Sequence, residues 1–179
     1  MRTTLVVLSL VLVQTAFAQG RIGVTAGAQL FNGNLHDGNI APSLSVHYET
    51  VGALESFGFR FEGHLNPLGG LLGGGLFCGT EYKLAGQPDG LHLSLFGGLE
   101  GDIHMFSFEP ADSGSKIPVR FVMDIGPLAG LQIGYRGRQR LGVVLTIAGF
   151  IGYRAFLDGE VDSETSVAWS AIATGGILF

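Results

Sequence analysis

The last fifteen residues of the chain, Thr165 to Phe179, read TSVAWSAIATGGILF. Because side chains in an extended strand alternate between two faces, every second residue of this stretch shares a face. One face would carry Val167, Trp169, Ala171, Ala173, Gly175, Ile177 and Phe179. The stretch ends on an aromatic residue with no polar tail, which we expect of a strand whose end lies at a membrane interface. We therefore interpret it as the strand that closes a transmembrane β-barrel.

The composition favours a membrane protein, but not a helical one. Hydrophobic residues make up 46% of the 179 residues and charged residues only 14%, whereas roughly a quarter of an ordinary soluble domain is charged. A spanning helix needs about 20 consecutive apolar residues, and the longest apolar runs, 5–13 and 141–152, are shorter and interrupted. Apolarity in short pieces is typical of a barrel, in which only alternate residues face lipid.

The N-terminus has the features of a secretory signal peptide. Arg2 precedes the apolar run 5–13, and the tripeptide Ala-Phe-Ala at 16–18 has the small-x-small pattern of a cleavage site. We predict a signal peptide over 1–18 and an outer-membrane β-barrel domain over 19–179.

Charge and cysteine content exclude several functions. The formal net charge of −5 argues against nucleic acid as a partner. Cys78 is the single cysteine, so an intramolecular disulfide and a cysteine metal cluster are both excluded. We expect no cofactor.

Eight segments with period-two alternation follow the predicted signal peptide. They cover 21–31, 43–50, 57–66, 73–84, 91–104, 117–136, 141–154 and 165–179. The odd-numbered connections are mostly longer and more polar than the even-numbered ones, as expected for outer loops and periplasmic turns. The predicted fold is therefore all-β: an eight-stranded antiparallel up-and-down transmembrane β-barrel.

Pro127 lies inside the sixth segment. A closed barrel has no edge strand that could accommodate a proline, so we expect either a bulge or register break there, or a turn at Gly126-Pro127 that would change the strand count.

Aromatic residues on the predicted lipid face gather near the strand ends. The lower, periplasmic set is Tyr48, Phe57, Tyr82, Tyr135 and Phe179, and the outer set is Tyr153 and Trp169. Two such girdles are typical of barrels, because amphipathic rings favour the two interfaces of a bilayer.

The opposite faces of the segments carry most of the charges that lie within strands. The predicted lumen network is Arg60, Glu62, Glu81, Lys83, Glu100, Asp102, Arg120 and Asp124, with Arg21 and Glu49 on the same faces. Charges buried in a narrow barrel must pair, and eight strands leave little room for water. We expect a salt-bridged, largely plugged lumen; a narrow pore is an alternative.

One arrangement has the elements of a hydrolytic site. His92 and Ser94 share a face, and Glu81 lies on the neighbouring segment, so a histidine, a serine and an acid could come together. The His-x-Ser pattern resembles that of outer-membrane lipid A deacylases, but the predicted register turns both residues inward. We expect no enzyme, and a lipid-modifying hydrolase is the alternative.

The remaining charged and histidine residues predict no metal site. An acidic surface loop holds Asp158, Glu160, Asp162 and Glu164, without the ligand order of an EF-hand. The histidines His36, His47, His64 and His104 show no metal-ligand spacing. The arginines Arg136, Arg138 and Arg140 form a basic periplasmic turn that could meet anionic headgroups.

With its predicted signal peptide, eight alternating segments and aromatic end at Ile177 and Phe179, the chain resembles the small OmpA/OmpX-like outer membrane protein β-barrel family. The resemblance implies an outer-membrane location, contact with membrane lipids and lipopolysaccharide, and insertion by the assembly machinery that recognises the C-terminal strand. The expected role is structural, surface-contact or envelope integrity, with a possible envelope protein partner. A secreted lipocalin-like binder, with the apolar faces turned inward, is a further alternative.

Overall fold

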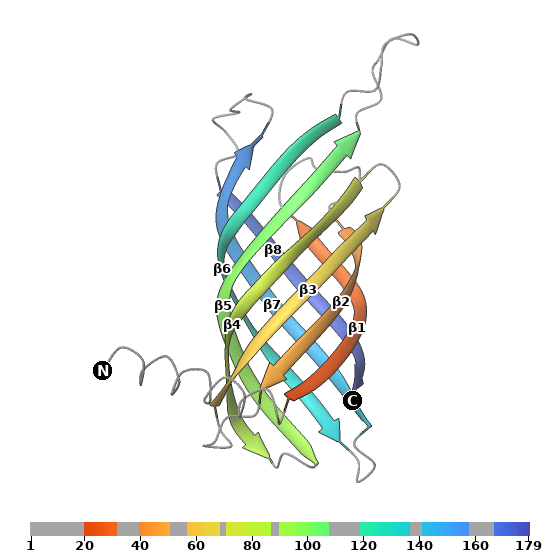
Figure 1. Ribbon diagram of the computed structural model, residues 1–179, viewed down its shortest axis with the longest axis vertical. Helices are drawn as coiled ribbons and strands as arrows, with labels where there is room; N and C mark the ends of the chain where they lie inside the picture. The colour runs from red at the N-terminus through yellow and green to blue at the C-terminus, as the bar shows by residue number, and fades with distance from the viewer. Residues whose placement is uncertain are drawn as a thin grey trace, which may run out of the picture.

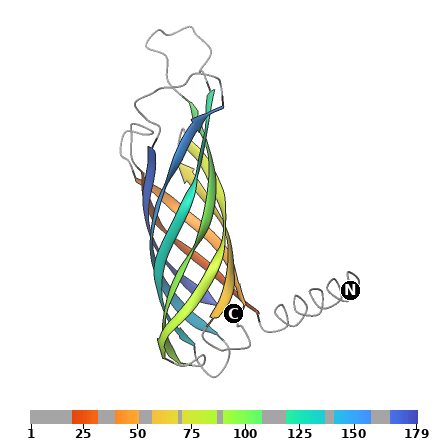
Figure 2. The ribbon, with the colours of Figure 1, turned by 90° about the vertical axis from the view of Figure 1, so that its left-hand side faces the viewer.

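The computed structural model describes residues 20–31, 40–50, 57–68, 71–86, 90–107, 119–136, 141–157 and 167–179. They form eight strands, wrapped into a tall, strongly tilted cylinder (Figures 1 and 2). The strands are β1 (Gly20–Phe31), β2 (Ile40–Thr50), β3 (Phe57–Leu68), β4 (Leu71–Gly86), β5 (Leu91–Ser107), β6 (Val119–Arg136), β7 (Gly142–Phe156) and β8 (Val167–Leu178). The predicted signal peptide lies outside these residues.

The sheet is a closed barrel in which each strand pairs antiparallel with the next. Closure comes from β8, which pairs with β7 on one side and with β1 on the other. Beyond the last paired residue, the Phe179 N–H donates to the Ile22 carbonyl oxygen at 2.8 Å. The predicted fold class, an eight-stranded antiparallel up-and-down barrel, is confirmed. No helix that could cross a membrane is found in the described part of the chain.

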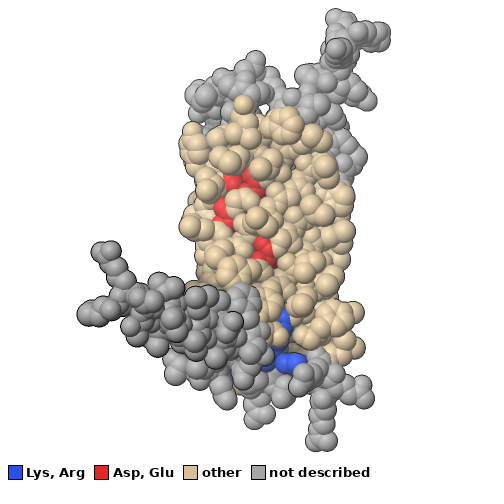
Figure 3. Space-filling model, in the orientation of Figure 1, with Lys and Arg blue, Asp and Glu red and all other residues tan. Residues whose placement is uncertain are grey.

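Alternation places apolar side chains outside and polar ones inside. On β7, for example, Leu145 and Ile147 are exposed, whereas Thr146 and Arg154 are buried. Figure 3 shows a wall whose visible charge is limited to small acidic areas and a basic area near one end. This is the reverse of a lipocalin-like barrel, so the alternative with apolar faces turned inward is wrong.

The two ends of the barrel differ. We call the end where β1 begins and β8 ends the lower end, as drawn in Figure 1, and the opposite end the upper end. The longest strands, β5 with 17 residues and β6 with 18, extend past their neighbours at the upper end. Both exceed the ~9–11 residues that a tilted strand needs to cross a bilayer.

The strand β6 runs without interruption through Pro127, so the turn considered at Gly126-Pro127 is wrong. The predicted register break is wrong as well: Ile125 pairs with Tyr153 and Leu128 with Phe150, which is one continuous register. Between Val122 and Arg136, pairing with β7 is missing at Gly126 and Pro127, since proline has no N–H to donate. Among the described strand pairs, a register shift lies instead in β4, between Lys83 and Ala85, where it pairs with β5.

Glycines let β4 and β5 approach closely in the interior. Gly79 and Gly98 are register partners, and a Cβ atom on either would collide with the backbone of the other strand. Gly101, further along β5, has nothing within 4 Å of such an atom.

We therefore expect Gly98→Ala to lower the free energy of unfolding by about 1–3 kcal/mol, because the added methyl group overpacks the β4–β5 contact. The measurement is urea unfolding of the protein refolded into lipid vesicles, followed by the fluorescence of Trp169. Gly101→Ala is the matched control and should leave the unfolding midpoint unchanged. Equal unfolding midpoints for the two variants would contradict a close approach of β4 and β5 at Gly98.

Candidate functional site

The barrel interior is the candidate site, and its largest network is centred on Arg60. The guanidinium group, 1% exposed, donates to one Glu62 oxygen from Nε at 3.1 Å and from Nη2 at 2.7 Å. Its Nη1 reaches across the barrel from β3 to the Gln132 side-chain oxygen on β6. Gln132 in turn donates to Glu49 on β2 at 3.2 Å. Because these strands are not all neighbours, the network links opposite walls.

An apolar cluster lies against this network. It consists of Phe77, Phe96, Leu128, Ala148, Phe150 and Ala168, contributed by the five consecutive strands β4 to β8. The Phe77 and Phe96 rings pack edge to face with centroids 5.8 Å apart. The Arg60 guanidinium carbon lies 4.3 Å from the centroid of the Phe96 ring, a cation–π distance that joins the cluster to the charged network.

A second ionic group lies on β5, β6 and β7. Arg154 donates to both oxygens of Asp124, at 2.8 and 2.7 Å, in the bidentate geometry that makes such pairs strong. The His104 Nε2 atom lies 3.7 Å from the same carboxylate. Arg154 was missed by the sequence analysis, although its alternation with Tyr153 and its shared parity with Thr146 place it on the interior face of β7.

A third group brings together an imidazole and two carboxylates. His64 of β3 lies 3.6 Å from Glu100 (Nδ1 to Oε1) and 3.2 Å from Asp102 (Nε2 to Oδ1), both on β5. One ligand atom from each residue lies within 4.8 Å of the other two. Within the described residues, these are the side chains that could hold a metal ion; the spacing of His64 in the sequence does not reveal it.

The predicted lumen charges occupy the interior to different degrees. Arg60, Glu100, Asp102 and Asp124 are buried, and Glu62, Glu81 and Lys83 are half-buried. Arg120 belongs to β6, but its side chain lies outside the described part. Arg21 and Glu49 are buried and form an ion pair at 3.6 Å near the lower end.

The candidate catalytic residues do not form a triad. His92 and Ser94 are buried on the interior face of β5. The His92 Nδ1 atom lies 3.4 Å from the Gly90 carbonyl oxygen, and its Nε2 atom has no hydrogen-bond partner. A nucleophile and its base need a mutual hydrogen bond, and none joins Ser94 to His92 in the described interior.

The predicted interface aromatics lie on the outer face. Tyr48, Tyr82 and Tyr135 precede the lower ends of β2, β4 and β6, Phe57 begins β3, and Phe179 follows β8. Tyr153 and Trp169 lie near the upper ends of β7 and β8. All are exposed except Tyr48, which is half-buried. The acidic residues at 158–164, Arg138, Arg140 and His36 lie outside the described residues.

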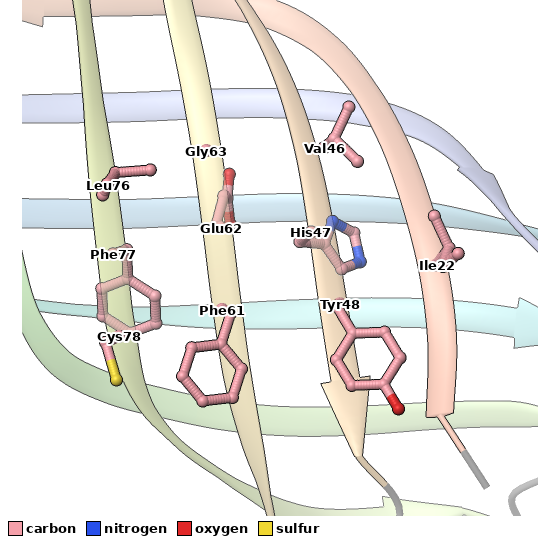
Figure 4. Close-up of a pocket in the computed structure, with 10 residues that line it drawn as sticks. All are labelled: Ile22, Val46, His47, Tyr48, Phe61, Glu62, Gly63, Leu76, Phe77 and Cys78. Carbon is pink, nitrogen blue, oxygen red and sulfur yellow. The ribbon is translucent and has the colours of Figure 1, made fainter. Parts of the chain in front are cut away.

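The outer wall is hollowed at Gly63. Figure 4 shows Val46 and Leu76 flanking Gly63, in agreement with the strand register. The missing side chain leaves an open groove of about 450 Å³, also lined by Phe61 and Cys78. Its outward lining is apolar, so hydrocarbon is the matching chemistry.

Comparison with known proteins identifies the fold. Neisserial surface protein A (NspA) is similar, with 12% identity, a TM-score of 0.55 and an alignment covering 89% of this chain and 95% of that one. A major outer membrane protein of Thermus thermophilus shares 15% identity with a TM-score of 0.54, and the alignment covers 89% of this chain and 98% of that one. The N-terminal β-barrel domain of Pseudomonas aeruginosa OprF shares 13% identity with a TM-score of 0.50, and the alignment covers 89% of this chain and 98% of that one.

No protein-family model matches the sequence, and no curated protein matches it either. Identities this low show a shared fold alone. At that level, the predicted resemblance to the small outer-membrane barrels is confirmed.

The Arg60–Glu62 pair offers a test of the interior network. Glu62→Ala should lower the free energy of unfolding by roughly 3 kcal/mol, because it leaves a buried guanidinium without its carboxylate. Replacing both partners, with Arg60→Met and Glu62→Leu, should restore most of the loss, since neither charge of the pair is then left without the other. Urea unfolding in vesicles measures both; a double variant as unstable as the single one would contradict the pairing.

Proposed function

We propose that the protein is an integral outer-membrane barrel whose closed interior serves a structural, surface-contact or envelope-integrity role. The observation that carries this proposal is the combination of an apolar outer face on all eight strands with charges inside the barrel, several of them buried in ion pairs. In water, such an arrangement would expose the apolar faces; in a bilayer, it satisfies both faces.

The same proposal includes export by a signal peptide cleaved after Ala18 and insertion through recognition of the C-terminal strand. The pairing of β8 with both β7 and β1 supports the second step, because the barrel cannot close before this strand is in place. Membrane lipids and lipopolysaccharide are the expected partners of the outer face, and the segments at the upper end would supply contacts with an envelope or surface partner.

The interior supports a plugged lumen rather than a pore or an enzyme. The aromatic cluster and the Arg60 network occupy the space that water would need, and Arg60 ties β3 to β6 across the barrel. The separation of His92 from Ser94 gives the hydrolase alternative no support. We therefore propose a protein without enzymatic activity.

The location is tested by fractionation and heat modifiability. Expressed with its N-terminal segment, the protein should appear in the outer-membrane fraction and migrate faster on a detergent gel before boiling than after it. The shift is expected because a closed barrel with every strand paired keeps its compact shape in cold detergent. Recovery as a soluble periplasmic protein with no shift would overturn the proposal.

The plug is tested by conductance in planar bilayers. The native protein should give no resolved channel openings, whereas the double variant Phe77→Ala, Phe96→Ala should conduct, because the edge-to-face pair beside Arg60 is removed. The chain offers a matched control: Phe57 and Phe59 also pack edge to face, with centroids 5.9 Å apart, but on the outer face. The double variant Phe57→Ala, Phe59→Ala should therefore give no resolved channel openings. Steady conductance by the native protein would show that the lumen is open.

A further inference from the structure

We propose that His64, Glu100 and Asp102 form a binding site for one divalent transition-metal ion inside the barrel. Their side chains are 6%, 2% and 2% exposed, and one potential ligand atom from each lies within 4.8 Å of the others. Metal bonds of about 2.0–2.2 Å keep ligand atoms within roughly 4.4 Å of one another. Small side-chain movements would therefore complete the coordination.

The intervening strand leaves room for this site. β4 lies between β3 and β5, and its residue in register with both His64 and Asp102 is Gly75. A Cβ atom there would collide with the Asp102 Oδ1 atom and come within 2.8 Å of the His64 ring. The absence of a side chain on Gly75 thus allows residues from two strands that are not hydrogen-bonded to each other to meet.

The charge of the cluster is not balanced by the arginines around it. In the ion pairs of the described interior, Arg60 binds Glu62, Arg154 binds Asp124, and Arg21 binds Glu49. The close ion contacts of Glu100 and Asp102 are with His64, and His104 also interacts electrostatically with Asp102. Two buried carboxylates beside histidines would carry a large desolvation cost, which a divalent cation offsets.

The hydrogen bonding of the cluster is also incomplete. The buried atoms Glu100 Oε2, Asp102 Oδ1 and His64 Nε2 have no hydrogen-bond partner in the protein. The 3.2 Å approach of His64 to Asp102 is therefore a close contact without hydrogen-bond alignment. A histidine nitrogen and carboxylate oxygens that converge in this way can serve together as metal ligands.

A small cavity adjoins the cluster. It has a volume of about 20 Å³ and is lined by His64, Glu100 and Glu62 together with apolar residues such as Phe77 and Phe96. A cavity of this size holds about one water molecule. It would supply the open coordination position that a three-ligand site leaves to water.

The donor set selects the class of ion. One imidazole nitrogen and two carboxylate oxygens suit Zn²⁺ or Mn²⁺, whereas Ca²⁺ and Mg²⁺ prefer oxygen ligands alone. The competing arrangement is a proton shared between Glu100 and Asp102, which would relieve their repulsion without a metal.

The experiment uses Zn²⁺ as the probe and the full barrel without an affinity tag. Because the site is buried, the protein is refolded in detergent with or without Zn²⁺, desalted, and assayed for zinc by atomic emission, with gel mobility before boiling reporting folding. We expect about one zinc per folded chain and a higher unfolding temperature with zinc than without it. Refolding with Mg²⁺ or Ca²⁺ should produce neither effect.

The variant Glu100→Gln, Asp102→Asn keeps the side-chain shapes and should lower zinc retention at least about tenfold, because both anionic ligands are lost. Gly75→Ala should have the same effect by filling the site. Glu81→Gln, which changes an interior carboxylate outside the cluster, should retain zinc. The proposal fails if the folded native barrel retains no zinc, which would favour the shared proton, or if the double variant retains as much zinc as the native protein.

Discussion

The barrel depends on the pairing of β8 with β1. This seam closes the sheet, so that the wall presents no strand edge between its two ends. Closure is what allows a strand fold to sit in hydrocarbon, because an unpaired backbone N–H or C=O group there costs several kcal/mol. It also fixes which residues face inward, since a shift of one residue along the seam would turn every side chain of β8 to the other face.

Closure also has a consequence for the interior, where polar side chains need partners other than water. Side chains that point inward from eight strands are cut off from water, and each polar group must find a partner there. The chain pairs part of these groups in the Arg60 network and the Asp124–Arg154 pair, and fills the space beside the network with an aromatic cluster. The Arg60 network links β3 to β6, which do not pair with each other, so it stabilises the cylinder in a direction that backbone hydrogen bonds do not reach. Asp124 and Arg154 are instead cross-strand partners on the paired strands β6 and β7.

Glycines on β4 control which side chains can meet. Gly75 and Gly79 both face the interior, and both leave space that neighbouring residues use: His64 and Asp102 around the first, and the backbone of β5 at the second. Glycine at these two positions thus shapes the interior packing as much as a charged residue does. This effect cannot be predicted from the glycine alone, because it depends on which atoms occupy the space beside it.

The sequence by itself determined the strands and their faces. Period-two alternation is a local property, and it sufficed to predict eight strands, the outward position of residues such as Trp169, and the inward position of Arg60 and Asp124. The wrong expectation at Pro127 has a physical reason: a missing N–H interrupts pairing with β7 at Gly126 and Pro127, and whether the register survives depends on the neighbouring strand. Arg154 belonged to the same local pattern and could have been assigned to the lumen from its parity.

Only the tertiary structure decided which interior residues touch. Arg60 and Gln132 are 72 positions apart, and His64 and Asp102 come from strands separated by β4. Such contacts depend on barrel curvature, strand stagger and the space above a glycine, none of which has a period in the sequence. The local sequence thus determines which face of a strand each side chain lies on, whereas the closed three-dimensional barrel determines which interior side chains contact one another.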